Sequence, residues 1–315
     1  MLRRLSLGVW CGCLAVIGLT SLPAARAADD PNGPKYLKFS TEHFDVELDA
    51  AHAEYRPYVE TYLELGYRLF EKYTGYDYNA MMNKVAEGAV HKPRYYYGFP
   101  NSDHMWAKGF GGGLTGWNNS QMNVGLVTGL TEEKLRTDQT ALSIMWHELA
   151  NGWANVYVSH DGKPTNVPEW FGAEGHAGFI RSVAMREVGF PKNQVEEYQR
   201  AVTAFDQYID GKAHDPGGVC HVVLESIWQA YSWKPLRAVY DAIQHDGVRF
   251  PKDDAPRANG MVVALMSKAV GENMLPFFEQ SKIPVDDKTR EELKDLPKSS
   301  MKVARTLWLP AAPQK

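Results

Sequence analysis

A nine-residue segment near the middle of the chain restricts the possible folds more than any other feature. Residues 145–153 are Met-Trp-His-Glu-Leu-Ala-Asn-Gly-Trp. Apolar side chains recur every three or four residues from Leu142 to Trp153, which predicts an amphipathic helix with one buried ridge. His147 and Asn151 lie four residues apart and therefore share a face beside that ridge. The residues around this face are small or apolar, so we expect it to be covered: they are Ser143, Ile144, Ala150 and Ala154.

The His-Glu pair in this helix is the first half of a zinc-binding pattern. In H-E-x-x-H, two histidines four residues apart bind one zinc ion, and the glutamate acts as general base on the zinc-bound water. His147 and Glu148 are present here, whereas Asn151 occupies the position of the second histidine. An amide carbonyl is a neutral, hard oxygen donor and binds zinc less well than imidazole does. The sequence therefore predicts a zinc site that is weak or, in the alternative, absent.

A second segment offers a third ligand. Residues 168–179 are PEWFGAEGHAGF, in a helix expected over 168–188. Glu174 lies one turn from apolar and small side chains, where a carboxylate is unfavourable unless it is paired or bound to a cation. Glu169 has a different expected role, because Asn166 three residues before it completes the pattern of a helix-capping box. Glu174 is therefore the first candidate and Glu169 the second.

The strings WHELANGW and PEWFGAEGHAGF resemble the two active-site helices of the gluzincin metallopeptidases. In that family the second helix supplies a glutamate as the third zinc ligand. Residues 270–284 (VGENMLPFFEQSKIP) are similar to a C-terminal segment of the enhancin-like branch, and the resemblance extends over residues 94–284. It implies an α+β fold with an N-terminal β-sheet part, a mostly helical C-terminal part and an active-site cleft between them.

The resemblance also implies roles for single residues. His147, Asn151 and Glu174 would be the metal ligands, and Glu148 would be the general base. The family uses a tyrosine or histidine from its helical part to stabilise the oxyanion, a role for which His221, Tyr231 and Tyr240 are candidates. Each of these three is equally explained by ordinary packing in a core rich in aromatic residues.

Two departures from the family pattern both fall at the metal site. Asn151 replaces a histidine, and the interval from Trp170 to Glu174 is one residue longer than usual.

The remaining pattern predicts strands first and helices afterwards. Strands are expected over 35–48 and 94–99, with a helix over 55–73 between them. A Gly- and Asn-rich stretch (109–126) follows, and its strand at 121–126 is a candidate edge for pairing with an extended peptide. Further helices are expected over 138–157, 193–209, 218–230, 235–244, 260–270 and 272–280, before a wrapped or loose tail. The predicted division is a signal peptide (1–27), one catalytic domain (28–290; β-containing 35–130, helical 137–290) and a C-terminal tail (291–315).

The first 27 residues have the pattern of a cleavable export signal. Arg3 and Arg4 precede an apolar stretch, which ends before Ala-Arg-Ala at 25–27. The arginine pair also fits a twin-arginine signal in part. Cleavage would remove three of the 34 basic residues and none of the 38 acidic ones, so the net charge would change from −4 to −7. This balance argues against nucleic acid or an anionic membrane as a partner.

Cleavage would leave Cys220 as the single cysteine, which excludes an internal disulfide. We expect Cys220 to be a small buried side chain.

These observations lead to two functional hypotheses. The first is a secreted or periplasmic metallopeptidase-like protein that hydrolyses peptides or proteins with zinc and has no stable membrane insertion after signal cleavage. The alternative is a catalytically inactive pseudopeptidase that binds an extracellular peptide or glycoprotein, a hypothesis that Asn151 favours.

Overall fold

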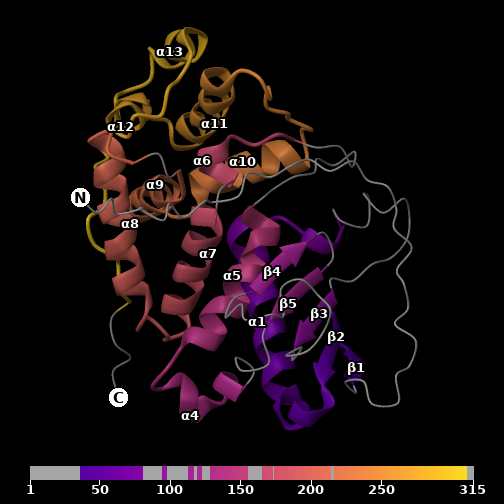
Figure 1. Cartoon of the computed structure of the whole chain (residues 1–315). Helices are drawn as coiled ribbons and strands as arrows, with labels where there is room; N and C mark the ends of the chain where they lie inside the picture. Colours follow the sequence, from indigo (N-terminus) through magenta and orange to yellow (C-terminus); the bar gives the residue numbers. More distant parts are fainter. Residues whose placement is uncertain are drawn as a thin grey trace, which may run out of the picture. The chain divides into compact units, whose positions relative to one another are not determined.

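The strands of the chain form one five-stranded sheet in the order β1-β2-β3-β5-β4 (Figure 1). The pairs β2–β3 and β3–β5 are parallel, whereas β1–β2 and β4–β5 are antiparallel. The chain between β2 and β3 includes a long helix, as a parallel crossover requires. The strands are β1 (Tyr36–Ser40), β2 (Asp45–Asp49), β3 (Arg94–Tyr97), β4 (Gly113–Gly116) and β5 (Asn119–Met122).

The structure is a computed structural model that describes residues 36–80, 94–97, 113–116, 119–122, 128–154, 165–172, 174–213 and 216–310. All of these belong to one compact unit, Pro34–Lys315. The predicted signal peptide lies outside the described residues. Among the described helices, none is both long enough and apolar enough to cross a membrane.

The single strand predicted over 35–48 is instead a hairpin. The backbone N–H of Thr41 donates to the carbonyl of Phe44 at 2.8 Å and so reverses the chain between β1 and β2. Phe44, Val46 and Leu48, at every second position of the second half of this segment, are buried, as one face of a half-buried strand is expected to be.

The prediction that the strand at 121–126 forms an edge of the sheet is wrong. β5 lies between β3 and β4, so its backbone groups pair with strands on both sides. The edge of the sheet on this side is β4, which the glycine-rich segment forms. Residues 123–126 lie outside the described residues.

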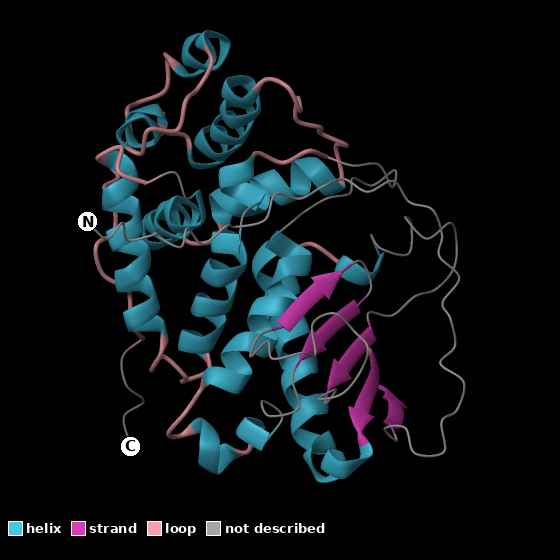
Figure 2. Ribbon diagram, in the orientation of Figure 1, coloured by secondary structure: helices cyan, strands magenta, loops and turns pink. Residues whose placement is uncertain are grey.

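Helix α1 (Arg56–Thr74) packs closely against α5 (Thr140–Ala154). The indole Nε1 of Trp146 donates to the carbonyl of Tyr62 at 2.8 Å. A Cβ atom at Gly66 would lie 2.7 Å from that same nitrogen, so the two helices approach as closely as a glycine allows. Figure 2 shows the sheet on one side of these two helices and the remaining large helices on the other.

The C-terminal part of the described chain is mostly helical, as predicted. The expected helices over 193–209, 218–230, 235–244 and 260–270 are confirmed to within a few residues, whereas α13 was not predicted. Within the helix predicted over 168–188, residues 169–172 and 174–187 are helical, and residue 173 lies outside the described residues. The elements are η1 (Ala50–Tyr55), η2 (Thr128–Leu130), α4 (Glu132–Leu135), α6 (Glu169–Gly172), α7 (Glu174–Glu187), α8 (Gln194–Ile209), α9 (Pro216–Tyr231), α10 (Lys234–Gln244), α11 (Ala255–Val270), α12 (Leu275–Gln280) and α13 (Asp287–Leu293).

After α13, residues 297–309 form a C-terminal strap that lies along α7, α8 and α9. The Tyr198 hydroxyl donates to the carbonyl of Ala304 at 2.8 Å, and the N–H of Ala304 donates to Ser226 Oγ at 2.9 Å. Near its end, the carbonyl of Trp308 accepts a hydrogen bond of 2.6 Å from Arg186. The boundary predicted at residue 291 falls inside α13.

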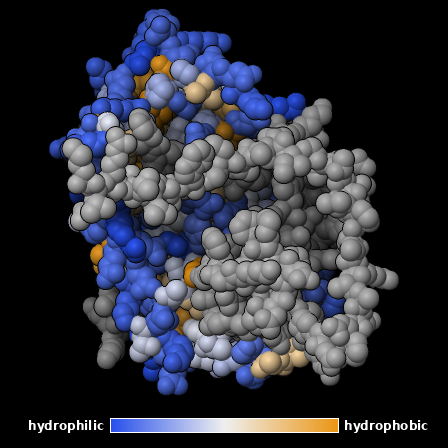
Figure 3. All heavy atoms as spheres, in the orientation of Figure 1, coloured by the Kyte–Doolittle hydropathy of each residue, from blue (hydrophilic) through white to orange (hydrophobic). Residues whose placement is uncertain are grey.

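On the face shown in Figure 3, hydrophilic residues predominate among the described atoms. Val195, Trp308 and Leu309 are the large apolar side chains that are exposed in the described part of the chain.

Candidate metal centre

Helix α5 carries His147, Glu148 and Asn151 and is held rigidly by its tryptophans. Trp153 Nε1 donates to the carbonyl of Tyr76 at 2.8 Å, in addition to the bond from Trp146 to α1. The predicted apolar ridge is confirmed, since all of its described members are almost fully buried: Leu142, Met145, Trp146, Leu149 and Trp153.

His147 meets Glu174 across the contact between α5 and α7. His147 Nε2 lies 2.7 Å from Glu174 Oε2. The two helices run antiparallel, because at their opposite ends the N–H of Lys192 donates to Gln139 Oε1 at 2.9 Å. The hydrogen bond with His147 lowers the pKa of Glu174, and partial burial opposes this effect.

α6 ends at Gly172 and α7 begins at Glu174, and residue 173 lies outside the described residues. Glu174 is paired, as its surroundings in the sequence suggested. Its expected burial is wrong, because 72% of its side chain is exposed.

Asn151 and Glu148 lie side by side in the interior. Asn151 Nδ2 is 3.4 Å from Glu148 Oε2. Asn151 is 8% exposed and Glu148 is 7% exposed. The amide nitrogen of Asn151 thus faces the Glu148 carboxylate.

Arg181 is a charged neighbour of this site that the sequence analysis did not single out. Its guanidinium forms an ion pair with Glu197 of α8, and only 11% of its side chain is exposed. Burial lowers the pKa of Arg181, whereas the negative charges of Glu197 and Glu148 oppose that shift. The sequence could have pointed to Arg181, because it lies seven residues after Glu174, two turns along the same face of α7.

His221 is buried between α7 and α9. Its Nδ1 would lie 3.6 Å from a Cβ at Gly178, one turn after Glu174. Burial lowers the pKa of His221 to about 3, and the charges of Arg181, Arg186 and His147 act in the same direction. The ring is therefore neutral at physiological pH. It is near the site, but as a neutral group it cannot supply a positive charge to an oxyanion.

Tyr231 is not brought to the site. It lies ten residues after His221 on α9, about 15 Å along the helix axis. Its hydroxyl donates to Glu272 Oε2 at 2.7 Å and lies 2.5 Å from Ser299 Oγ of the C-terminal strap.

The other candidates of the sequence analysis have structural contacts. The Tyr240 hydroxyl lies 3.1 Å from the carbonyl of Trp153 and 3.0 Å from His176 Nε2, which joins α10 to α5 and α7. Glu169, the second candidate ligand, is exposed and lines a pocket. α6 begins at Glu169, and the N–H groups of Phe171 and Gly172 donate to the carbonyl of Pro168. Cys220 is buried, as expected.

A separate group of possible metal ligands occurs near β2. The side chains of Glu42, His43 and Glu64 converge within 4.8 Å of one another. Glu64 already accepts hydrogen bonds from the ring and the backbone of His43, at 2.7 and 2.9 Å, and Glu42 pairs with Arg68 at 2.6 Å. These partners account for the group without an ion.

The residues at the α5–α7 contact fit a zinc ion with two strong donors. His147 Nε2 and Glu174 Oε2 face each other, and imidazole and carboxylate are both zinc ligands. Asn151, the third residue of the expected ligand set, has a neutral amide, and its nitrogen contacts Glu148. Among the described residues, the buried His147 Nδ1 has no hydrogen-bond partner, whereas the second nitrogen of a ligand histidine usually donates to one. This donor set therefore fits zinc with lower affinity than two histidines and a glutamate would.

Solved structures share this fold, although no protein-family model matches the chain and no curated protein is similar to it in sequence. A functionally unknown conserved protein from Bacillus anthracis str. Ames, in a mutant form, is 17% identical with a TM-score of 0.57; the match covers 85% of this chain and 53% of that one. A metallopeptidase from Bacteroides thetaiotaomicron is 12% identical with a TM-score of 0.53, and the match covers 84% of this chain and 47% of that one. The ZmpB metallopeptidase from Clostridium perfringens is 12% identical with a TM-score of 0.51, and the match covers 86% of this chain and 52% of that one.

The chain thus spans about half the length of each of these structures. At such low identity the likeness concerns the fold alone. The described chain has a mostly helical fold with a smaller sheet, of a kind that occurs in metallopeptidases.

Proposed function

We propose that this chain is an exported metallopeptidase-like protein of gluzincin type that hydrolyses peptide bonds in a zinc-dependent reaction. The observation that carries the proposal is the 2.7 Å distance between His147 Nε2 and Glu174 Oε2. Glu148 follows His147 on the same helix, α5. The metallopeptidase folds among the similar structures support it. A substrate cleft between the sheet and the helical part, and export through residues 1–27, belong to the same proposal.

His147 and Glu174 would hold the zinc ion, with Asn151 as a weak third donor. When bound, zinc would supply Lewis acidity to water and to the peptide carbonyl. The protein's own contribution is geometric, since the contact between α5 and α7 fixes the two donors.

Glu148 would take the proton from the attacking water and transfer it to the leaving amine. It is suited to this role because its carboxylate is almost fully buried and is neighboured by the positive charge of Arg181.

The alternative is a pseudopeptidase that binds an extracellular peptide or glycoprotein without cleaving it. The specific observation in its favour is Asn151, whose amide nitrogen faces Glu148 in the structure. In both hypotheses the partner is a peptide or protein rather than nucleic acid.

The test compares zinc content and affinity in the wild-type protein and in Asn151→His. We expect the added imidazole to tighten zinc binding by more than about 100-fold, since even loss of an outer-shell partner changes affinity 10–100-fold. In a mixed fluorogenic peptide library, we expect wild-type hydrolysis to require zinc and Asn151→His to need less zinc for the same rate.

Glu148→Gln is the matched control, because it keeps the shape of the side chain and removes the base. It should bind zinc as the wild type does and lose at least about 100-fold in hydrolysis. Zinc binding without hydrolysis in the wild type would support the pseudopeptidase. If neither wild type nor Asn151→His bound zinc, the proposed ligand set would be wrong.

A further inference from the structure

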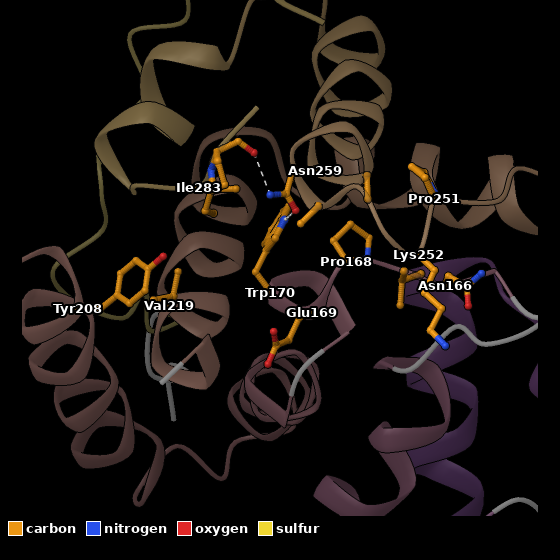
Figure 4. A pocket seen from close by; sticks show the side chains of 14 residues that line it. Asn166, Pro168, Glu169, Trp170, Tyr208, Val219, Pro251, Lys252, Asn259 and Ile283 are labelled. Carbon is orange, nitrogen blue, oxygen red and sulfur yellow. Dashed lines mark hydrogen bonds between the residues drawn. The ribbon is translucent and has the colours of Figure 1, made fainter. Parts of the chain in front are cut away.

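A pocket of about 500 Å³ lies beside α6, and its lining does not include His147 or Glu148 (Figure 4). Its lining comes from α6 and the loop before it, from the loop before α11 and the start of α11, from the end of α8, from α9, and from the loop after α12. This volume is within the range of small-molecule sites in proteins, which is roughly 300–1,000 Å³.

The floor of the pocket is apolar and preformed. Trp170 Nε1 donates to Asn259 Oδ1 at 3.0 Å, and Asn259 Nδ2 donates to the carbonyl of Pro284 at 2.8 Å. Phe278 packs edge-on behind the Trp170 ring, with their centroids 5.3 Å apart. Because these polar groups are already bonded to one another, the floor offers an occupant apolar surface that needs no rearrangement.

Two opposite charges line the same pocket. Glu169 begins α6, and Lys252 lies in the loop before α11. Both side chains are exposed, and within the described chain neither is part of a salt bridge. In the view of Figure 4, Pro168 lies between them. The pocket therefore combines an apolar floor with one anionic and one cationic group that are both available to a ligand.

We propose that this pocket binds short zwitterionic peptides with apolar side chains, with the ammonium group at Glu169 and the carboxylate at Lys252. The volume accommodates two or three apolar residues, and a single amino acid would leave much of it empty. A neutral apolar ligand would leave both charges unused, and a larger folded partner could not enter. The pocket does not include the proposed metal ligands, so this inference is independent of the proposed peptidase activity.

The first experiment titrates the full chain with the dipeptide Leu-Leu by calorimetry. For a ligand of this size we expect a dissociation constant on the order of 10⁻⁴ M. Ala255→Trp, at an exposed position on the pocket lining, should block binding, whereas Ala230→Trp, at an exposed helical position elsewhere, should not. Absence of Leu-Leu binding at ~10 mM, about a hundredfold above the expected constant, or unchanged binding to Ala255→Trp, would overturn the proposal.

The second experiment tests the two charges separately with capped peptides. Lys252→Met should weaken binding of N-acetyl-Leu-Leu about two- to fivefold and leave Leu-Leu-amide unchanged, since exposed ion pairs contribute modestly. Glu169→Gln should have the opposite selectivity. Both substitutions are at exposed positions, so they remain informative if Ala255→Trp does not fold. Equal effects of each variant on both capped peptides would contradict the assigned orientation.

A third variant separates this site from the metal centre. His147→Ala should retain Leu-Leu binding, because His147 does not line the pocket. Loss of binding in His147→Ala would place the peptide at the metal centre and overturn the proposal. Failure of the zinc experiments would leave the expected result here unchanged.

Discussion

At the scale of single residues, the interior contains several polar side chains whose partners determine their charge. Arg186 and Glu225 form a bidentate pair with distances of 3.0 and 2.7 Å, and 1% and 0% of their side chains are exposed. His176 is different because its partners are neutral: it bonds the carbonyl of Phe171 and lies against Tyr240. A buried pair keeps both charges, whereas a buried histidine with neutral partners stays uncharged.

The first prediction concerns the acid stability that follows from His176. Burial lowers its pKa to about 4, although the hydrogen bond to Phe171 opposes this. The unfolded chain binds the same proton near pH 6.5, so between these values the unfolded state binds more protons. The contribution of neutral His176 to stability is therefore complete above pH 6.5 and is lost as the pH falls towards 4.

When the pH falls from 7.5 to 4.5, the protonation of His176 should by itself lower the free energy of unfolding by about 2–3 kcal/mol. Urea unfolding of the wild type and of His176→Asn at several pH values measures this. The variant should be less stable at pH 7.5 but should lose less stability on acidification. Equal losses in the two proteins would show that His176 does not titrate as described.

At the scale of elements, the site depends on how closely three helices approach. α1 supports α5 through Gly66, and α5 meets α7 at His147 and Glu174. Glu174, the first residue of α7, lies opposite His147. The approach of these two side chains is thus a property of helix packing as much as of the two motifs.

The second prediction compares two helical glycines. At Gly66 an added methyl group would lie 2.7 Å from Trp146 Nε1 and 2.8 Å from Leu149 Cδ2, and Trp146 cannot move without losing its bond to Tyr62. At Gly178 the nearest atom would be 3.6 Å away, an ordinary contact. Gly66→Ala should therefore lower the free energy of unfolding by about 1–2 kcal/mol, despite the better helix propensity of alanine.

Gly178→Ala is the control for this prediction. It should be neutral or raise stability by up to about 1 kcal/mol, because the helix gains propensity without a clash. Both values come from chemical denaturation at pH 7.5. A stabilising Gly66→Ala would mean that α1 and α5 are not packed as tightly as the structure shows.

At the scale of the whole molecule, the C-terminal strap joins helices that are distant in sequence. It accepts hydrogen bonds from Tyr198 and Arg186 and donates one to Ser226, on α8, α7 and α9 respectively. Tyr231 also bonds Ser299 of the strap. These contacts keep buried polar groups satisfied along one side of the helical part.

The third prediction is that truncation after Lys298 destabilises the protein by about 3–5 kcal/mol. Truncation removes the partner of the buried Tyr198 hydroxyl, which costs about 1–3 kcal/mol. It also removes one of the hydrogen bonds of Arg186, of Ser226 and of Tyr231, and each lost bond contributes about 0.5–1.5 kcal/mol. Truncation after Pro310 keeps all the contacts named above and is the control. Denaturant unfolding of both forms gives the difference, and equal stability would show that the strap does not support the helices.

The sequence by itself determined the local features of the site. The spacing of apolar residues located α5 and its buried ridge, and the spacing of four placed His147 and position 151 on one face. Glu174 was singled out as a candidate metal ligand because a carboxylate among apolar and small residues needs a partner; in the structure it pairs with His147, although most of its side chain is exposed. The long helices of the C-terminal part followed from the same periodicity, because it depends on neighbours within a few residues.

Only the tertiary structure decided which distant parts meet. The order of the strands made β4, rather than 121–126, the edge of the sheet, and strand pairing depends on segments far apart in the chain. Packing placed Tyr231 with Glu272 and Ser299, buried His221 as a neutral ring, and brought Arg181 towards Glu148. Helical periodicity gives the face on which a side chain lies, but the partner of that face is set by the packing of the whole chain.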